Sequence, residues 1–252
     1  LTTYHYDKAI YNKTKTDELF VKKADVQSLV GSKKSLNVVT EGVDNTGATD
    51  VTEKLNEIFV KANAEKYEEV IFPDGTYKIE NVVKIFCPEK KSRSLVVRSE
   101  NTYGATILCD HTDASQGDIG FVLTRNTPED QDDITNAYNT TINGFIFKVK
   151  DQDAEGSSFK FIGTSSDFNQ LLFTNLKLLN LRMTNTKDCA GNNIDLAAQC
   201  NNLTIDNVKA NYGMYAIYLE YTDGINNNIS NIVSNNCTFC LCTYSYVDFE
   251  TV

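Results

Sequence analysis

Asparagine recurs at a fixed phase along the second half of this 252-residue chain. The strings TINGF, FTNLK, IDNVK and ISNIV each set an asparagine at the edge of an apolar stretch, and successive ones are 32, 32 and 24 positions apart. A motif repeating in phase every few tens of residues is typical of a solenoid. Asparagine tolerates the left-handed backbone of a sharp corner, and its amide can bond the asparagine of the next coil. The pattern predicts stacked coils with corners at Asn143, Asn175, Asn207 and Asn231.

Short segments rich in β-branched and aromatic residues fill the chain beyond residue 90, and helical periodicity is absent there. They include SLVVRS (94–99), ATILC (105–109), GFVLT (120–124), TINGFIFKV (141–149) and YAIYLEY (215–221). Alternate residues of a strand face the same side, so every second residue of these segments points inward. We predict a core that includes Leu55, Ile58, Val70, Phe72, Ile107, Phe145, Leu176, Ile205, Val208, Ile217, Leu219 and Ile232.

Residues 41–79 combine a polar turn, a helix and a tight corner between two strands. Asp50 followed by Glu53 forms a capping-box pattern, and one apolar face predicts a helix over about 51–66. In VIFPDGTYKI (70–79), Pro73 ends the first strand because proline cannot donate to a ladder. Asp74 and Gly75 then make the turn into the second strand.

This region resembles the N-terminal cap of the pectate-lyase-like superfamily of right-handed parallel β-helices. In that superfamily a turn, a capping helix and an FP-x-G-T-Y strand close one end of the solenoid. The resemblance implies an all-β, right-handed, single-stranded parallel β-helix over residues 39–252, with its cap at 41–79 and its coils at about 94–240. The matching positions are Gly42, Asp44, Asp50, Thr52, Leu55, Ile58, Phe72, Pro73, Gly75, Thr76 and Tyr77.

Residues 1–38 are polar and rich in lysine, and they look helical from about Asp17. The string YNKTKTDELFVKKAD resembles segments that precede the receptor-binding domains of bacteriophage tail fibres and spikes. That resemblance implies a short helical neck over 1–38, a homotrimer, contacts with other tail or baseplate proteins through the N-terminus, and a place in the virion after synthesis in the host cytoplasm. Cell-surface localisation is the alternative.

Composition argues against several classes of partner and cofactor. The net charge of −10 disfavours nucleic acid, and no apolar run approaches the roughly 18 residues of a membrane span. No signal-peptide pattern is visible at the start. Cys237, Cys240 and Cys242 have no nearby fourth ligand, and with only two histidines in the chain we expect no metal site and no cofactor. We expect the seven cysteines to be mostly reduced.

Outward-facing positions supply the candidate functional residues. Asp195 and Glu220 are 25 residues apart, which predicts neighbouring coils about 4.8 Å apart, close to the roughly 5–5.5 Å of a retaining glycosidase pair. Asp206 and Asp223 are alternative catalytic carboxylates. Tyr218 and Tyr221 are candidates for stacking on a glycan. The plain alternative is that these acidic residues are solvated side chains of the outer surface.

Three functions remain open at this level. The chain is a trimeric phage tail spike or fibre that recognises a cell-surface polysaccharide, a polysaccharide depolymerase of the hydrolase or lyase type, or a surface β-helix adhesin. A fold by itself does not distinguish them.

Overall fold

The computed structural model describes residues 33–110, 120–125, 135–153, 159–164, 171–187, 191–220 and 224–244. Its contacts divide the chain into two units, Leu1–Lys34 and Ser35–Val252. Residues 1–32 of the predicted neck lie outside the described residues. The second unit begins with a strand, β1 (Ser35–Asn37), that pairs with β3 (Glu69–Phe72), so these last residues of the predicted neck are part of the sheet.

The largest sheet has eleven strands and two arms. One arm follows the order β1–β3–β6–β10, and the other follows β2–β4–β7–β11. The longer strands β14, β17 and β19 pair with each other along their whole length and so run through both arms. The strands of this sheet are β1 (Ser35–Asn37), β2 (Thr46–Asp50), β3 (Glu69–Phe72), β4 (Gly75–Ile79), β6 (Leu95–Ser99), β7 (Ala105–Cys109), β10 (Thr140–Asn143), β11 (Ile146–Val149), β14 (Lys177–Thr184), β17 (Thr204–Asn211) and β19 (Asn228–Asn235).

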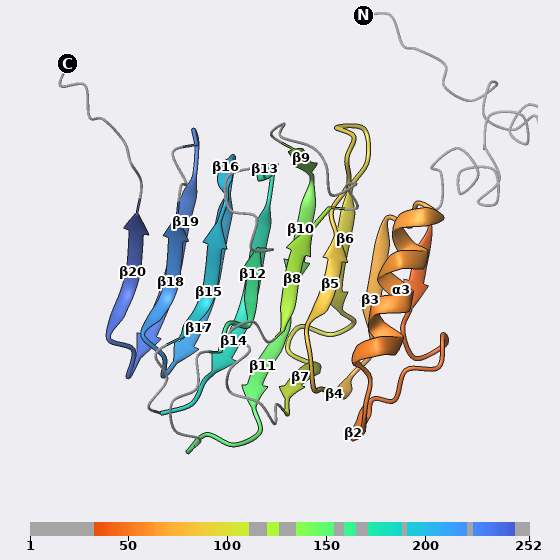
Figure 1. The fold of residues 1–252 in the computed structure, drawn as a ribbon, viewed down its shortest axis with the longest axis horizontal. Coiled ribbons are helices and arrows are strands. Elements are labelled where there is room, and N and C mark those ends of the chain that lie inside the picture. Colours follow the sequence, from red (N-terminus) through yellow and green to blue (C-terminus); the bar gives the residue numbers. More distant parts are fainter. Residues whose placement is uncertain are drawn as a thin grey trace, which may run out of the picture. The chain divides into compact units, whose positions relative to one another are not determined.

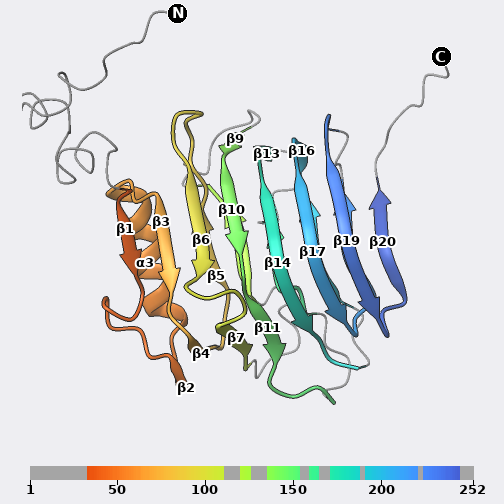
Figure 2. The ribbon, with the colours of Figure 1, turned by 180° about the vertical axis from the view of Figure 1, so that it is seen from behind.

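Two smaller sheets complete the coils, with the three-stranded sheet contributing to three described coils only, and every strand pairing in the described residues is parallel (Figures 1 and 2). The six-stranded sheet contains β5 (Val83–Phe86), β8 (Phe121–Thr124), β12 (Ile162–Thr164), β15 (Asn192–Ala197), β18 (Tyr215–Glu220) and β20 (Phe239–Tyr244). The three-stranded sheet contains β9 (Thr135–Tyr138), β13 (Leu171–Thr174) and β16 (Gln199–Asn201). Each strand therefore pairs with its counterpart one coil later, which confirms the predicted right-handed parallel β-helix.

Asparagine corners bend the long strands where they pass from one arm to the other. Asn180, Asn207 and Asn231 have φ of 53°, 54° and 54°, in the left-handed region. Asn180 Nδ2 donates to Asn143 Oδ1 over 2.9 Å, and Asn207 Nδ2 donates to Asn180 Oδ1 over 2.7 Å. An amide ladder of the predicted kind is therefore present, but it joins Asn143, Asn180 and Asn207, whereas Asn231 Nδ2 donates to Asp206 and not to Asn207.

One member of the predicted ladder belongs elsewhere. Asn175 does not stack with Asn143 or Asn207 but with Asn139 and Asn202, at 2.7 Å and 3.2 Å, in a second ladder at the other end of the same arm. The two ladders share coil lengths, because the bonded asparagines are 36 or 37 residues apart and then 27. The two equal gaps of 32 residues in the sequence run from Asn143 to Asn175 and from Asn175 to Asn207, and so from one ladder to the other and back. Their equality is a coincidence of unequal coil lengths.

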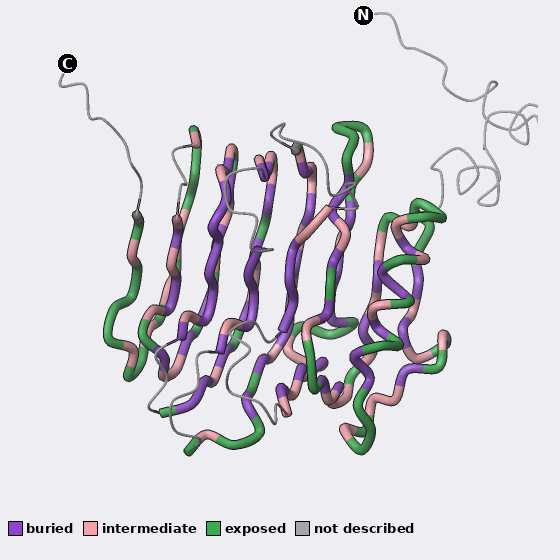
Figure 3. The backbone as a smooth tube through the Cα atoms, in the orientation of Figure 1, coloured by how far each residue is buried: buried purple, intermediate pink, exposed green. Residues whose placement is uncertain are grey.

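Buried residues, purple in Figure 3, recur along the strands, and most of them are apolar. Of the twelve predicted core residues eleven are buried, and Ile232, on β19, is partly buried. Phe72, Phe121 and Phe145 meet in the centre with ring centroids 5.2 to 6.1 Å apart. Phe147 continues this stack toward the later coils, 5.2 Å from Phe121.

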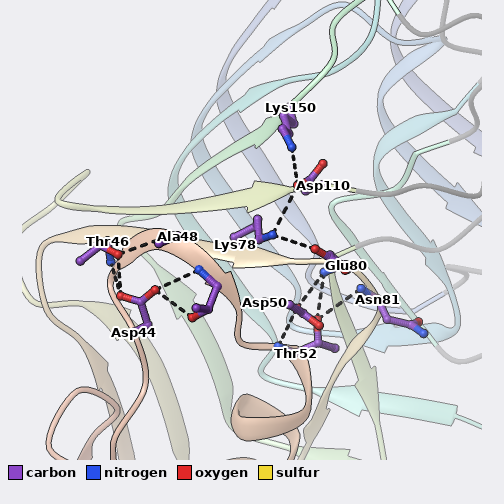
Figure 4. Close-up of polar contacts among 11 residues, drawn as sticks. Asp44, Thr46, Ala48, Asp50, Thr52, Lys78, Glu80, Asn81, Asp110 and Lys150 are labelled. Atoms are coloured by element: carbon purple, nitrogen blue, oxygen red, sulfur yellow. Dashed lines mark hydrogen bonds and ion pairs between the residues drawn. The ribbon is translucent and has the colours of Figure 1, made fainter.

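The single helix of the described residues, α3 (Thr52–Ala64), covers the first coil. Its apolar face is buried as predicted, but the capping box is not formed. The helix begins one residue later than a cap at Asp50 requires, and Val51 takes the N-cap position without a side-chain bond. Asp50 instead accepts hydrogen bonds from the backbone N–H of Thr52 and of Glu80, so it ties the helix to the end of β4 (Figure 4). No described helix is both long enough and apolar enough to cross a bilayer.

The Pro-Asp-Gly corner lies between β3 and β4, where the first coil passes from one arm to the other. The hydroxyl of the fully buried Tyr77 donates to the Pro73 carbonyl over 2.7 Å. Asn45 Nδ2 donates to the Asp74 carbonyl over 2.9 Å, and Asn101 Nδ2 donates to the Asp74 carboxylate over 2.9 Å. The first coil has no asparagine ladder here, so these bonds hold its corner.

Candidate functional site

Aromatic side chains gather on the outer face of the last two strands of the six-stranded sheet, β18 and β20. The Tyr215 ring lies 5.2 Å from Phe239 in a stacked arrangement and 5.2 Å from Tyr218 at a tilt. The sheet register places Tyr215 directly opposite Phe239 on the next strand. Phe239 is 50% exposed, so this aromatic face, defined as Tyr215, Tyr218 and Phe239, is open to solvent.

Tyr218 was predicted to point outward. The structure agrees, because Tyr218 is partly exposed while its neighbours Ile217 and Leu219 are buried. Partial burial, followed by the negative charge of Glu220, raises the pKa of the Tyr218 phenol above its ordinary value of 10.0. The hydroxyl therefore stays protonated at neutral pH and is available as a hydrogen-bond donor. Tyr221 lies outside the described residues.

Asp195 comes from β15, at the edge of the aromatic face and directly opposite Tyr218. It is only 6% exposed. Its Oδ2 accepts a 2.7 Å hydrogen bond from Asn192 Nδ2 and lies 3.2 Å from Lys160 Nζ. An ion-paired, nearly covered carboxylate fixes the local structure well, but it leaves little room for a reacting group.

Glu220 and Asp195 lie on neighbouring strands, as their spacing predicted, but they are not opposite each other. Glu220 pairs with Ala197, two residues further along β15 than Asp195. The offset between the two coils is 23 residues, whereas the two carboxylates are 25 residues apart. Positions offset by two residues on adjacent strands are about 7–8 Å apart. That separation of strand positions is wider than the roughly 5–5.5 Å between the carboxyl groups of a retaining pair, and it leaves room for an inverting pair, whose carboxyl groups are roughly 6.5–9.5 Å apart.

Of the two alternative carboxylates, Asp206 is part of an asparagine corner. Asn231 Nδ2 and Ser230 Oγ both donate to its Oδ1, at 2.7 and 2.8 Å. These bonds lower the pKa of Asp206 below its ordinary value of 3.8, with the Asn231 bond the larger cause. Asp206 thus replaces an asparagine oxygen in the ladder one coil before Asn231. Asp223 lies outside the described residues.

The described cysteines divide into a buried set and a set on the last coil. Cys87, Cys109 and Cys200 are buried, and burial raises the pKa of the Cys87 and Cys200 thiols to about 12. Cys237, Cys240 and Cys242 are at least partly exposed, and among the described residues no cluster of metal-ligating side chains is found. The buried thiols are packing groups, since thiols with so high a pKa stay protonated.

Sequence reasoning missed Tyr215 and Phe239 as parts of the face. The signal was present, because the coil that contains them repeats after 24 residues and sets the two rings opposite each other. The pairing of Tyr215 with Phe239 could be recognised only once the number of residues between these two strands of successive coils was known. Lys160, the ion-pair partner of Asp195, comes from a coil whose alignment no sequence motif marks.

Comparisons with known proteins agree on the fold. No family model matches the sequence, and no curated protein does. Among solved structures, the A-module of the Azotobacter vinelandii mannuronan C-5 epimerase matches with a TM-score of 0.54 and 13% identity over 79% of this chain and 49% of that one. This chain therefore spans about half the length of that module.

Two other solved structures match with lower TM-scores. The surface adhesin PfbA of Streptococcus pneumoniae gives a TM-score of 0.41 and 12% identity over 83% of this chain and 57% of that one. Tailspike protein 3 of bacteriophage CBA120 gives 0.37 and 13% identity over 81% of this chain and 34% of that one. Parallel pairing, stacked coils, the capping helix and the epimerase match together show that the described residues from Ser35 onward form a right-handed parallel β-helix.

Proposed function

We propose that this chain is a polysaccharide-binding β-helix that recognises a cell-surface glycan through the aromatic face. The observation that carries the proposal is the open stack of Tyr215, Tyr218 and Phe239 on the strand that also carries the partly exposed carboxylate of Glu220 and on its neighbour. A sugar ring has an apolar C–H face and a rim of hydroxyls. Aromatic rings bury the first, and hydroxyl and carboxylate groups bond the second.

The resemblance of the N-terminal segment to phage tail segments supports a more specific role. We propose that the chain belongs to a homotrimeric tail spike or fibre, and that the segment before Ser35 joins it to other tail proteins. A homotrimer of a 28.2 kDa chain is expected to elute with three times that mass in light scattering of the full chain. A monomeric mass would remove the support for the neck.

Depolymerisation is the second candidate, and one observation favours it. The two-residue offset between Asp195 and Glu220 corresponds to the spacing of an inverting glycosidase, which needs room for a water molecule between acid and base. The ion pair of Asp195 with Lys160 argues for a structural role instead. Binding without cleavage is therefore the primary proposal. A surface adhesin that is not part of a phage would bind the glycan in the same way.

The test is incubation of the full chain with capsular or cell-wall polysaccharides from candidate hosts, followed by measurement of bound polymer, chain length and new reducing ends. Bound but uncut polymer supports the binding role. Shortened chains with new reducing ends support the depolymerase, and in that case Asp195→Asn and Glu220→Gln should each abolish the cleavage. Absorbance near 235 nm from an unsaturated product would separate a lyase from a hydrolase.

The aromatic face is tested by Tyr218→Ala, which should weaken binding at least tenfold. Tyr138→Ala is the matched control, because Tyr138 is also partly buried but lies on the three-stranded sheet. Equal loss in the two variants, or no loss in Tyr218→Ala, would contradict the placement of the site on this face.

A further inference from the structure

A basic groove lies on a different face of the β-helix from the aromatic stack. It lines the second arm of the long sheet across β11, β14, β17 and β19, whose ends lie side by side in Figure 2. Its volume is about 850 Å³, and its lining includes the side chains of Lys148, Arg182 and Lys209. Among the described residues, the lining holds no carboxylate, although the chain has a net charge of −10. The groove thus concentrates positive charge on an acidic protein.

The sheet register sets two of these charges directly against each other. Arg182 pairs with Lys209 on the neighbouring strand, and both are exposed. Lys148 pairs with Thr184, so it is the diagonal neighbour of Arg182. Like charges directly opposite on adjacent strands destabilise a sheet. A bound anion would relieve this repulsion, which makes the row a suitable place for one.

Neighbouring lysines of this arm are paired with carboxylates, which sets the row of Lys148, Arg182 and Lys209 apart. Lys150, two residues after Lys148, lies 2.7 Å from Asp110, and Lys78 lies 2.7 Å from Glu80. Within the described parts of the chain, Lys148, Arg182 and Lys209 make no ion pair. Their charges are therefore available to an external anion.

The guanidinium of Arg182 is held in place by a strained residue. Its Cζ lies 3.8 Å from the centre of the Tyr103 ring, within the range of a cation–π contact. Tyr103 has a φ of 68°, which is unfavourable for a bulky side chain. Its hydroxyl accepts a hydrogen bond from Asn207 Nδ2 over 3.3 Å, so the corner ladder supports the ring. Arg182 is thus oriented before any ligand arrives, which lowers the entropic cost of binding.

The geometry points to a second binding site, in which Arg182, Lys209 and Lys148 hold a carboxylate or sulfate group of an acidic polysaccharide. Neutral polar side chains surround the three cations, and Thr184, Asn211 and Ser234 can bond the hydroxyls of the same sugar. The anion chemistry follows from the groove alone. The choice of a glycan as the carrier of the anion rests on the proposed function.

The test measures binding of the full chain to polygalacturonate and to dextran sulfate, with neutral dextran and duplex DNA as comparison polymers. Arg182→Gln and Lys209→Gln should each weaken binding of the preferred acidic polymer at least tenfold, and the effect of salt on binding should shrink in both. Preference for polygalacturonate identifies a carboxylate as the bound group, and preference for dextran sulfate identifies a sulfate.

Lys177→Gln is the matched control, because Lys177 is an exposed lysine of β14 on the other arm of the sheet. It removes the same charge and should change affinity less than twofold. Circular dichroism of each variant checks that the fold is intact, and these exposed side chains are expected to leave it so.

Several results would overturn the second site. Lys177→Gln weakening binding as much as Lys209→Gln would show that only net charge matters. If DNA bound as tightly as the acidic polysaccharides, the ligand would not be specifically a glycan. If no acidic polymer bound, the groove would not be an anion-binding site. Loss of acidic-polymer binding in Tyr218→Ala, with full binding in Arg182→Gln and Lys209→Gln, would overturn this site and leave the proposed function standing.

Discussion

The side-chain amide of Asn207 donates to Oδ1 of Asn180 one coil earlier, over 2.7 Å, and both residues have a left-handed backbone. Asn180 donates in turn to Asn143 over 2.9 Å, so it is the middle member of the ladder. The ladder does two things at one position. It joins the amides of three coils by hydrogen bonds, and at Asn180 and Asn207 it stabilises a backbone conformation that most residues avoid.

Replacing Asn180 should separate these two effects. Asn180→Ala removes two hydrogen bonds and keeps the unfavourable φ, so it should lower the free energy of unfolding by roughly 2–3 kcal/mol. Asn180→Gly relieves the φ and removes the same bonds, so its loss should be smaller. Urea unfolding of the two variants measures the difference, and an Asn180→Gly variant less stable than Asn180→Ala would contradict this account of the corner.

Gly75 should tolerate no side chain, because it begins β4 with a φ of 150° and a Cβ there would collide with the backbone carbonyl of Asn45. Gly75→Ala should lower the free energy of unfolding by roughly 2–4 kcal/mol. Gly163→Ala is the control, since a Cβ at Gly163 meets its nearest atom, the Asp195 carbonyl oxygen, at 3.4 Å. Thermal melting compares the two variants. Equal melting temperatures would contradict the close approach of the Asn45 carbonyl to Gly75.

Acid should destabilise the chain in part through Asp206. Because the pKa of Asp206 is lowered from 3.8 in the folded state, its contribution to stability is fully present above that value and is lost as the pH falls through the folded pKa. Asp206→Asn removes this dependence, and its amide oxygen can still accept from Asn231. Between pH 6 and pH 2, the melting temperature of the native chain should therefore fall more steeply than that of the variant. Parallel curves would refute the assignment.

Asp195 and Glu220 should differ in their effect on stability. Asp195→Asn removes the partner of Lys160 at a nearly buried position, so it should cost roughly 1–3 kcal/mol, less than a fully buried pair because Lys160 is 28% exposed. Glu220→Gln changes a partly exposed side chain and should cost less than roughly 0.5 kcal/mol. Chemical denaturation measures both. If Asp195→Asn left the free energy of unfolding unchanged, the ion pair would have no structural role, and Asp195 would again be a candidate reacting group.

The sequence by itself determined the type of fold. Apolar alternation, the Pro-Asp-Gly corner and the recurrent asparagines each act over a few residues, so their physical reasons are visible locally. That is why eleven of twelve predicted core residues are buried and the capping helix lies where its apolar face predicted. The same local reading placed Tyr218 outward between Ile217 and Leu219.

The tertiary structure alone decided which residues of different coils meet. Coil length changes from 36 or 37 residues to 27 and then 24, and the inserted residues between strands give no local sign of the register they produce. For this reason Asn175 joins Asn139 and not Asn143, and Asp195 faces Tyr218 and not Glu220. The basic groove has the same origin, because Lys148, Arg182 and Lys209 converge only after three coils of different lengths are stacked in register.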